Sequence, residues 1–183
     1  MRSLVLIFMF LSGLLIFGGC SKLDDSTQMN IDLNPSPADF SIPITASLDA
    51  GILLTSIPVN LDLDAMIKLQ NKRFSKANVK SIRLTSVVLT LTSEDKEVNL
   101  SSVENVRMTI EGGGKTTELL ASLNAPDSQV KTLNIPVTST VNDLTSFISD
   151  GMVTYIFKGK LRKPTTQNLV GKAALTYRVE LGL

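Results

Sequence analysis

The chain has 183 residues, of which 43% are hydrophobic and 19% are charged, with no His, no Trp and a single Cys. The absence of His excludes Ser-His-Asp and Cys-His nucleophile systems, and one Cys excludes an internal disulfide and multi-cysteine metal sites. The formal net charge of +1 excludes the strongly basic footprint of typical nucleic-acid binders.

The N-terminus carries the features of an export signal. Arg2 is followed by an uncharged, mostly apolar run over residues 4–17 and then by Gly18-Gly19-Cys20. A basic start, an apolar stretch and small residues before a cleavage point define a secretory signal peptide. The run is shorter than the roughly 20 residues that a spanning helix needs. We therefore expect residues 1–19 to be removed; an ordinary signal that leaves a free thiol, or an uncleaved anchor, are the alternatives.

The residues around Cys20 resemble the lipobox of bacterial lipoproteins, and residues 21–25 (Ser-Lys-Leu-Asp-Asp) resemble the export tag of Bacteroidetes-type surface lipoproteins. The resemblance implies acylation, including palmitate, at Cys20, attachment to the outer membrane and display on the cell surface. Two or more acyl chains anchor a protein stably where one is marginal. Asp25-Ser26-Thr27 fits the O-glycosylation pattern of the same group, with Ser26 as the acceptor. The alternative for these polar residues is that they only keep a tether solvated.

The next segment predicts a spacer between the membrane and the domain. Residues 21–38 contain two prolines, many small polar residues and little periodicity. Such composition is typical of a linker. We therefore expect a lipidated flexible tether over residues 20–38 and a single folded domain over residues 39–183.

Within that domain, apolar and polar residues alternate, which predicts strands. The alternating stretches cover residues 40–46, 52–63, 79–92, 106–110, 117–123, 130–137, 152–161 and 173–181. Pro43 favours a sheet edge for the first, and Pro58 indicates an edge or a bulge in the second. In the third stretch the two-residue period slips between Leu84 and Val87, which predicts a β-bulge near Thr85-Ser86 or a strand buried on both faces.

Two short stretches predict helices between strands. They cover residues 64–70 and 142–148, with Asp64 as N-cap of the first and Asn142 or Thr140 as N-cap of the second. Many short strands with little helix favour an all-β fold. We therefore expect an antiparallel β-sandwich, immunoglobulin-like or jelly-roll, of about eight strands with two short helical crossovers.

The acidic residues do not form a convincing catalytic pair. Asp62 and Asp64 lie two residues apart, and glycosidases need only two carboxylates, but they also need a cleft that holds a sugar. With no Trp and few aromatic residues, we interpret Asp64 as a helix cap and Asp62 as solvated. We expect neither enzymatic activity nor a cofactor.

A basic stretch is the candidate ligand site. Lys158, Lys160 and Arg162 share one face of a predicted strand, and Lys163 lies beside them. Such a patch is suited to an anionic ligand, such as a polyanionic glycan, a lipid phosphate or an acidic protein. The alternative is that the lysines protect an exposed strand edge against aggregation.

The domain resembles two kinds of β-sandwich. Edge-strand prolines, a short helix and long alternating strands resemble the water-stress (LEA14-type) domains, and Asn34-Pro35-Ser36 is similar to their Asn-Pro-Asn motif, with Ser36 in the last place. A lipoprotein signal before a sandwich resembles fimbrillin-type subunits. Neither resemblance specifies a function, and we expect a non-catalytic binding or structural role in the envelope.

The expected partners are the membrane, through Cys20, and a protein or glycan ligand, but no nucleic acid. A fimbrial or adhesin subunit, and a carbohydrate-binding accessory protein or glycan-processing enzyme, are the alternatives.

Overall fold

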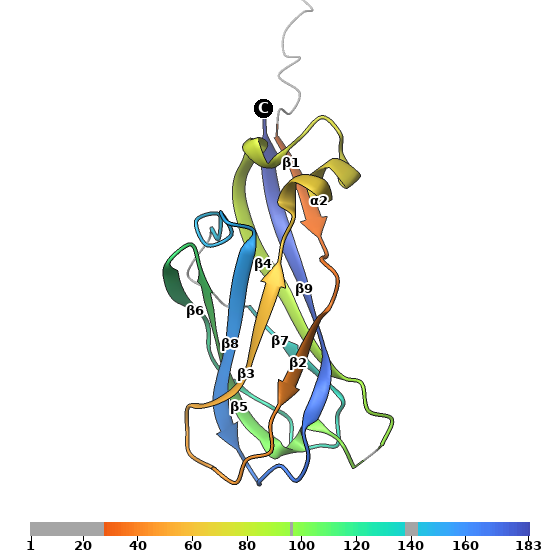
Figure 1. The fold of residues 1–183 in the computed structure, drawn as a ribbon, viewed down its shortest axis with the longest axis vertical. Coiled ribbons are helices and arrows are strands. Elements are labelled where there is room, and N and C mark those ends of the chain that lie inside the picture. Colours follow the sequence, from red (N-terminus) through yellow and green to blue (C-terminus); the bar gives the residue numbers. More distant parts are fainter. Residues whose placement is uncertain (1–27, 96, 138–142) are drawn as a thin grey trace, which may run out of the picture.

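The computed structural model describes residues 28–95, 97–137 and 143–183, and in this part nine strands form two antiparallel sheets that pack face to face (Figure 1). Sheet A has the order β1-β9-β4-β7, with β2 also paired to β9, and sheet B has the order β3-β8-β5-β6. The strands are β1 (Gln28–Leu33), β2 (Ala38–Ile42), β3 (Ile52–Asn60), β4 (Val79–Leu91), β5 (Val103–Gly112), β6 (Lys115–Asn124), β7 (Thr132–Ile135), β8 (Met152–Leu161) and β9 (Leu169–Gly182). The all-β sandwich predicted from the alternation is confirmed.

Alternation produces the core directly, because successive side chains of a strand point to opposite faces. In β8 the buried residues include Val153, Tyr155 and Phe157, and in β9 every second residue from Leu169 to Leu181 is buried. These inward faces meet between the sheets and form one hydrophobic core. In the described ranges, no helix is long and apolar enough to cross a bilayer.

The strand order identifies the sandwich topology. If β1 and β2 are taken as two halves of one interrupted strand, the first strand pairs with the last, β3 pairs with β8, β4 with β7, and β5 with β6. This nested pairing is that of a long hairpin rolled into two layers, which is jelly-roll connectivity. The structure therefore decides between the two sandwich topologies that the sequence left open.

The bulge expected in β4 is present. Leu84 lies opposite Tyr177, and Ser86 lies opposite Thr176, so Thr85 is the extra residue. Its Oγ1 donates to the carbonyl of Thr176 at 3.1 Å. The insertion explains how Leu84 and Val87, three positions apart, can both point into the core.

The domain begins earlier than the sequence predicted. Residues 28–33, expected as part of the flexible tether, form β1 and pair with β9 from Gln28–Gly182 to Leu33–Tyr177. Ile31 and Leu33 are buried in the core. Pro35 and Pro37 interrupt the pairing before β2 continues along the same edge of β9. The boundary at residue 38 is therefore too late.

The helical predictions need two corrections. The first helix is α2 (Leu63–Gln70), but its N-cap is Asp62, whose Oδ1 accepts from the Ala65 N–H at 3.0 Å. Asp64 lies in the first turn and binds Lys68 instead. Where a second helix was expected, the described residues 143–151 form turns, and the proposed caps Asn142 and Thr140 lie outside the described residues.

Asp143 holds these turns against β4. Its Oδ1 accepts from the backbone N–H of Ile82 at 3.0 Å and of Thr145 at 2.9 Å. Partial burial raises the pKa of Asp143, but these bonds, together with that from the Thr145 hydroxyl, bring its pKa below the ordinary value overall. A charged carboxylate therefore takes the place of the expected helix cap.

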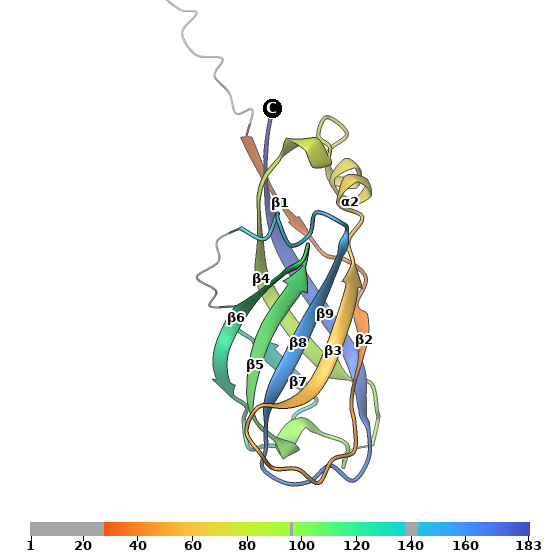
Figure 2. The same cartoon turned by 60° about the vertical axis from the view of Figure 1, so that its left-hand side comes forward.

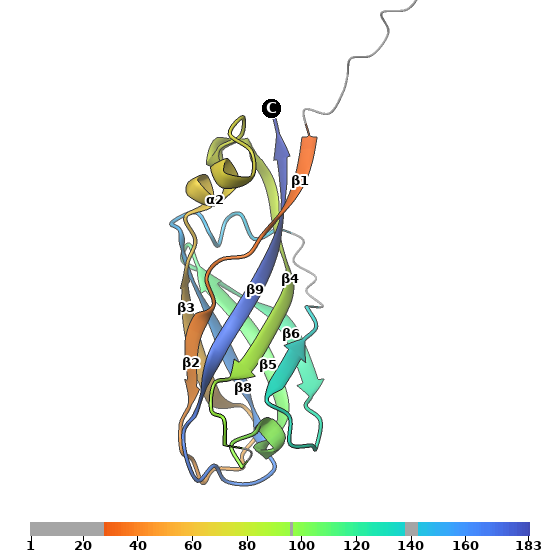
Figure 3. The same cartoon turned by 90° about the vertical axis from the view of Figure 1, so that its right-hand side faces the viewer.

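The two ends of the sandwich differ. Figures 2 and 3 show α2 and the 3₁₀ turn η1 (Lys76–Asn78) at the end where β1 begins and where Leu183 lies. The opposite end carries the loops that follow β2, β4 and β8, including the 3₁₀ turn η2 (Leu100–Ser102). We call these the α2 end and the loop end.

Candidate functional site

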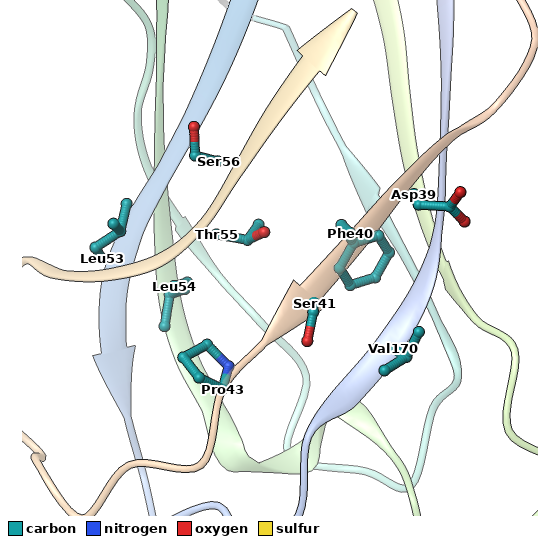
Figure 4. Close-up of a pocket in the computed structure, with 9 residues that line it drawn as sticks. All are labelled: Asp39, Phe40, Ser41, Pro43, Leu53, Leu54, Thr55, Ser56 and Val170. Atoms are coloured by element: carbon teal, nitrogen blue, oxygen red, sulfur yellow. The ribbon is translucent and has the colours of Figure 1, made fainter.

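A groove opens where an edge of sheet A meets an edge of sheet B. It lies between β2 and β3 and has a volume of about 510 Å³ (Figure 4). Its lining residues are Asp39, Phe40, Ser41, Pro43, Leu53, Leu54, Thr55, Ser56 and Val170. We call it the edge groove.

The groove exists because two neighbouring strands do not pair. In the described part of the chain β2 pairs only with β9, and β3 pairs only with β8. Each strand therefore presents an open row of backbone N–H and C=O groups along the groove. Pro43 follows β2 and Pro58 lies within β3, so residues that cannot donate to a ladder bound the open stretch. The edge position predicted for Pro58 is confirmed, whereas β2 ends at Ile42 and does not run on through Pro43 to residue 46.

The floor of the groove is built from one large side chain of each sheet, seated over a glycine. Phe40 lies opposite Gly171, where an added Cβ would lie 2.7 Å from the phenyl ring. Leu54 lies over Gly159, where an added Cβ would lie 2.9 Å from its Cδ1. Both floor side chains are buried, so the bottom of the groove is continuous with the core.

The rim carries apolar side chains that nothing in the described structure covers. Leu53 is 57% exposed and Val170 is 47% exposed. A bulge in β3 between Leu53 and Thr55 explains the pattern, because it turns both Leu54 and Thr55 inward and leaves Leu53 outside. Exposed aliphatic side chains on both walls of one concavity are a feature of binding sites.

The loop-end margin of the groove is held by a buried threonine. Thr165 is 5% exposed, and its hydroxyl donates to the carbonyl of Pro43 at 2.9 Å and accepts from the N–H of Thr45 at 2.8 Å. The N–H of Ile44 donates to Asn168 Oδ1 at 3.1 Å. These bonds hold the chain after β2 in place without a further strand.

The polar groups of the groove suit binding. They are the hydroxyls of Ser41, Thr55 and Ser56 and the carboxylate of Asp39. Asp39 forms an ion pair with Lys172 at 2.6 Å on the surface. Neither in the groove nor elsewhere in the described ranges do three or more acidic or Cys side chains come together as a metal site would require. The groove can therefore offer hydrogen bonds and apolar contact to a ligand.

A second concavity of about 470 Å³ lies on the same side of the sandwich, below α2. Asn34-Pro35-Ser36, the segment that resembles the LEA14-type motif, forms part of its wall. Asn34 Oδ1 accepts from the Thr176 hydroxyl at 2.8 Å. The segment thus bridges β1 and β2 over β9, which is a structural role.

Of the four bases expected to form an anionic-ligand patch, Arg162 and Lys160 have partners within the domain. The Arg162 guanidinium donates to the backbone carbonyls of Ser101 (3.1 Å), Val103, Ala125 and Pro126 (3.4 Å). It therefore ties the end of β8 to η2 and to the segment that follows β6. A guanidinium used in this way is not available to an anion.

Of the other three bases, Lys158 and Lys160 share the outer face of β8, and Lys163 lies at the loop end. Lys160 binds Glu104 at 3.0 Å, and Lys158 lies beside Arg107 on the outer face of sheet B. Lys163 lines a polar pocket of about 210 Å³ at the loop end, together with Glu97. Period-two spacing correctly placed Lys158 and Lys160 on one face, but it did not show the acid on the neighbouring strand. Cys20 and Ser26 lie outside the described residues.

Comparisons with known proteins show little likeness. No family model and no curated protein matches the chain. Among solved structures, the VP2 subviral particle of infectious bursal disease virus matches 85% of this chain and 32% of its own, at 8% identity and a TM-score of 0.37. The Gx strain of that virus gives 11% identity and a TM-score of 0.35, and Desmodium yellow mottle tymovirus gives 9% and 0.29. This chain spans about a third of the two bursal disease virus chains.

Proposed function

We propose that this chain is a lipid-anchored protein of the bacterial outer membrane, displayed at the cell surface, and that its domain binds an extended segment of another envelope protein without catalysis. The signal sequence and the position of Cys20 after Gly18-Gly19 support the anchor. The edge groove supports the binding role, and its two unpaired strand edges are the observation that carries it.

The two edges favour a peptide over other ligands. An extended backbone can pair with an open strand edge through main-chain hydrogen bonds, while its alternate side chains enter pockets. The edge groove offers both features, because its walls are open edges and its floor is apolar. The prolines at either end limit the pairing to a short segment. An apolar small molecule would use the floor and the rim but leave the strand edges unpaired.

The anchor is tested in the membrane fraction. Mass spectrometry of the intact protein should show a chain that starts at an acylated Cys20, and Cys20→Ser should release the protein from that fraction. Trypsin treatment of intact cells tests display: a surface protein is cut before lysis. A soluble, unmodified wild-type chain would contradict the anchor and leave the groove to be judged on its own.

The groove is tested with a random peptide library displayed on phage and panned against the full chain in detergent. We expect enriched peptides with apolar residues at alternate positions, because only every second side chain of a strand faces the floor. Leu53→Glu and Val170→Glu should abolish their capture. Met152→Glu is the matched control, since Met152 is 60% exposed on the neighbouring strand β8 but does not line the groove.

Hydrogen exchange supplies the second readout. A bound peptide should slow the exchange of backbone amides in β2 and in residues 53–57 of β3, where the open edges lie. Peptides captured equally by the groove variants would disprove the site. Binding of a hydrophobic dye to the groove, with no enriched peptide, would assign it to an apolar small molecule instead.

A further inference from the structure

We infer that the α2 end of the domain lies against an anionic lipid surface, so that the loop-end margin of the edge groove lies away from the membrane; this inference rests on the proposed lipid anchor. Residues 68–80 contain five bases and no acid, although the whole chain has a net charge of only +1. Lys72, Arg73, Lys76 and Lys80 are all exposed at this end. We call these four residues the basic cap.

Four acids at the α2 end accept hydrogen bonds within the domain, and Asp64 among them is balanced by its ion pair with Lys68. Asp62 caps α2, and Asp64 accepts from Lys68 Nζ at 2.5 Å and from the backbone N–H of Lys76 at 3.1 Å. These two bonds hold the pKa of Asp64 below its ordinary value. Glu180 accepts from the Ser81 hydroxyl at 3.1 Å, and Asp150 accepts from that of Ser149 at 3.2 Å.

The cap bases, by contrast, have no acidic partner among the described residues. Lys76 Nζ donates to the backbone carbonyl of Ser149 at 2.5 Å and forms no ion pair with a described acid. Lys72, Arg73 and Lys80 form no ion pair with any described side chain. The charge of the cap therefore faces solvent.

The position of the cap matches the position of the anchor. Asn71 Nδ2 lies 3.5 Å from Met29 Sδ, so the loop that carries Lys72 and Arg73 touches the first strand beside Gln28. Seven residues lie between Cys20 and Gln28, and the eight Cα–Cα steps span at most about 29 Å at full extension. A lipid at Cys20 would hold this end of the domain within that reach of the bilayer.

An exposed aliphatic side chain completes the surface. Leu69 is 85% exposed on α2, on the turn that precedes the cap, and Leu183 is 56% exposed at the same end (Figure 1). Each Lys or Arg close to an anionic bilayer strengthens the binding of a protein to that bilayer roughly fivefold. A cluster of such bases can therefore add to the membrane affinity that an acyl chain provides. A cation-rich end with protruding Leu residues therefore complements an anionic headgroup surface.

The experiment compares the full chain, purified from membranes, in phosphatidylcholine vesicles with and without phosphatidylglycerol. Hydrogen exchange of residues 68–80 should slow several-fold only when phosphatidylglycerol is present. High salt should reverse the effect, because the screening length falls to about 3 Å at 1 M. Exchange at the loop end should stay the same in both vesicles.

A charge-matched pair of variants separates the cap from general charge. Replacing Lys72, Arg73, Lys76 and Lys80 with Ser should remove the slowing, whereas replacing Arg107, Lys115, Lys158 and Lys163 with Ser should preserve it. If the chain floats with both vesicles but residues 68–80 exchange equally in them, the inference is wrong and the anchor stands. If the chain floats with neither vesicle, both proposals fail.

Discussion

The hydroxyls of Tyr155 and Tyr177 lie 2.6 Å apart at the centre of the core and form a hydrogen bond that joins the two sheets. Tyr155 belongs to β8 of sheet B and Tyr177 to β9 of sheet A, and both side chains are at most 1% exposed. They are the only two tyrosines of the chain. Each is the partner that makes burial of the other tolerable.

This pairing predicts a non-additive result for Tyr→Phe variants. Either single variant leaves one buried hydroxyl without its partner, which costs about 1–3 kcal/mol of unfolding free energy, whereas the double variant removes both polar groups and is closer to neutral. We expect the double variant to be less destabilised than the sum of the singles. Urea denaturation of the four proteins measures this coupling. Additive losses would show that the hydroxyls do not depend on each other.

The same pair predicts a steep loss of stability at alkaline pH. Burial raises the pKa of both tyrosines, and for Tyr155 the neighbouring Tyr177 raises the pKa further. Above about pH 10 the unfolded chain loses these protons while the folded chain keeps them, so unfolding becomes progressively favoured as the pH rises. The tyrosinate absorbance at 295 nm should therefore appear together with the loss of the far-UV circular dichroism signal. Tyrosinate formation in a folded chain would contradict this.

Replacing Arg162 should lower the stability of the domain strongly, although the sequence suggests only a charged surface residue. Its guanidinium binds four backbone carbonyls, so Arg162→Ala should cost about 1.5–3 kcal/mol of unfolding free energy. Arg162→Lys should recover only part, because an ammonium cannot reproduce the planar set of donors. Lys158→Ala, at an exposed position of β8, the strand that ends just before Arg162, should stay within about 0.5 kcal/mol. Thermal or urea unfolding compares the three variants; equal effects of Arg162→Ala and Lys158→Ala would mean that the carbonyl contacts contribute nothing.

The glycines below the edge groove should resist substitution. At Gly171 an added Cβ would lie 2.3 Å from the Thr90 carbonyl oxygen, and at Gly159 it would lie 2.0 Å from that of Asn105. Either Ala variant should lose about 1–3 kcal/mol through overpacking. Gly182→Ala is the control, because its added Cβ meets only the flexible Lys80 side chain. Equal melting temperatures for the three variants would contradict the close approach.

Local patterns predicted local features well. The phase slip between Leu84 and Val87 located the Thr85 bulge because inward and outward positions of a strand alternate strictly. The first strand was missed because Ile31 and Leu33 are only two buried positions among polar residues and prolines, and their partner β9 lies about 150 residues away along the chain. Alternation shows that a face is buried, but it does not show which strand will pair with it.

The site could not be predicted for the same reason. The edge groove depends on β2 and β3 becoming neighbours without pairing, and this follows from the whole topology. The prolines at positions 43 and 58 indicated edges, but not that the two edges would face each other. Spacing placed Lys158 and Lys160 on one face, yet Glu104 and the carbonyls that bind Arg162 come from elsewhere in the fold.

The position of β9 imposes an order on assembly. This strand is the shared partner of β1, β2 and β4, and it is the last strand along the chain. During synthesis, the first strands must wait unpaired until Leu169–Gly182 has been made, because contacts of such long sequence separation close late. A chain stopped at residue 168 would have nothing to hold β1 and β2 in sheet A, so this domain should acquire its fold only after nearly all of it has been translated.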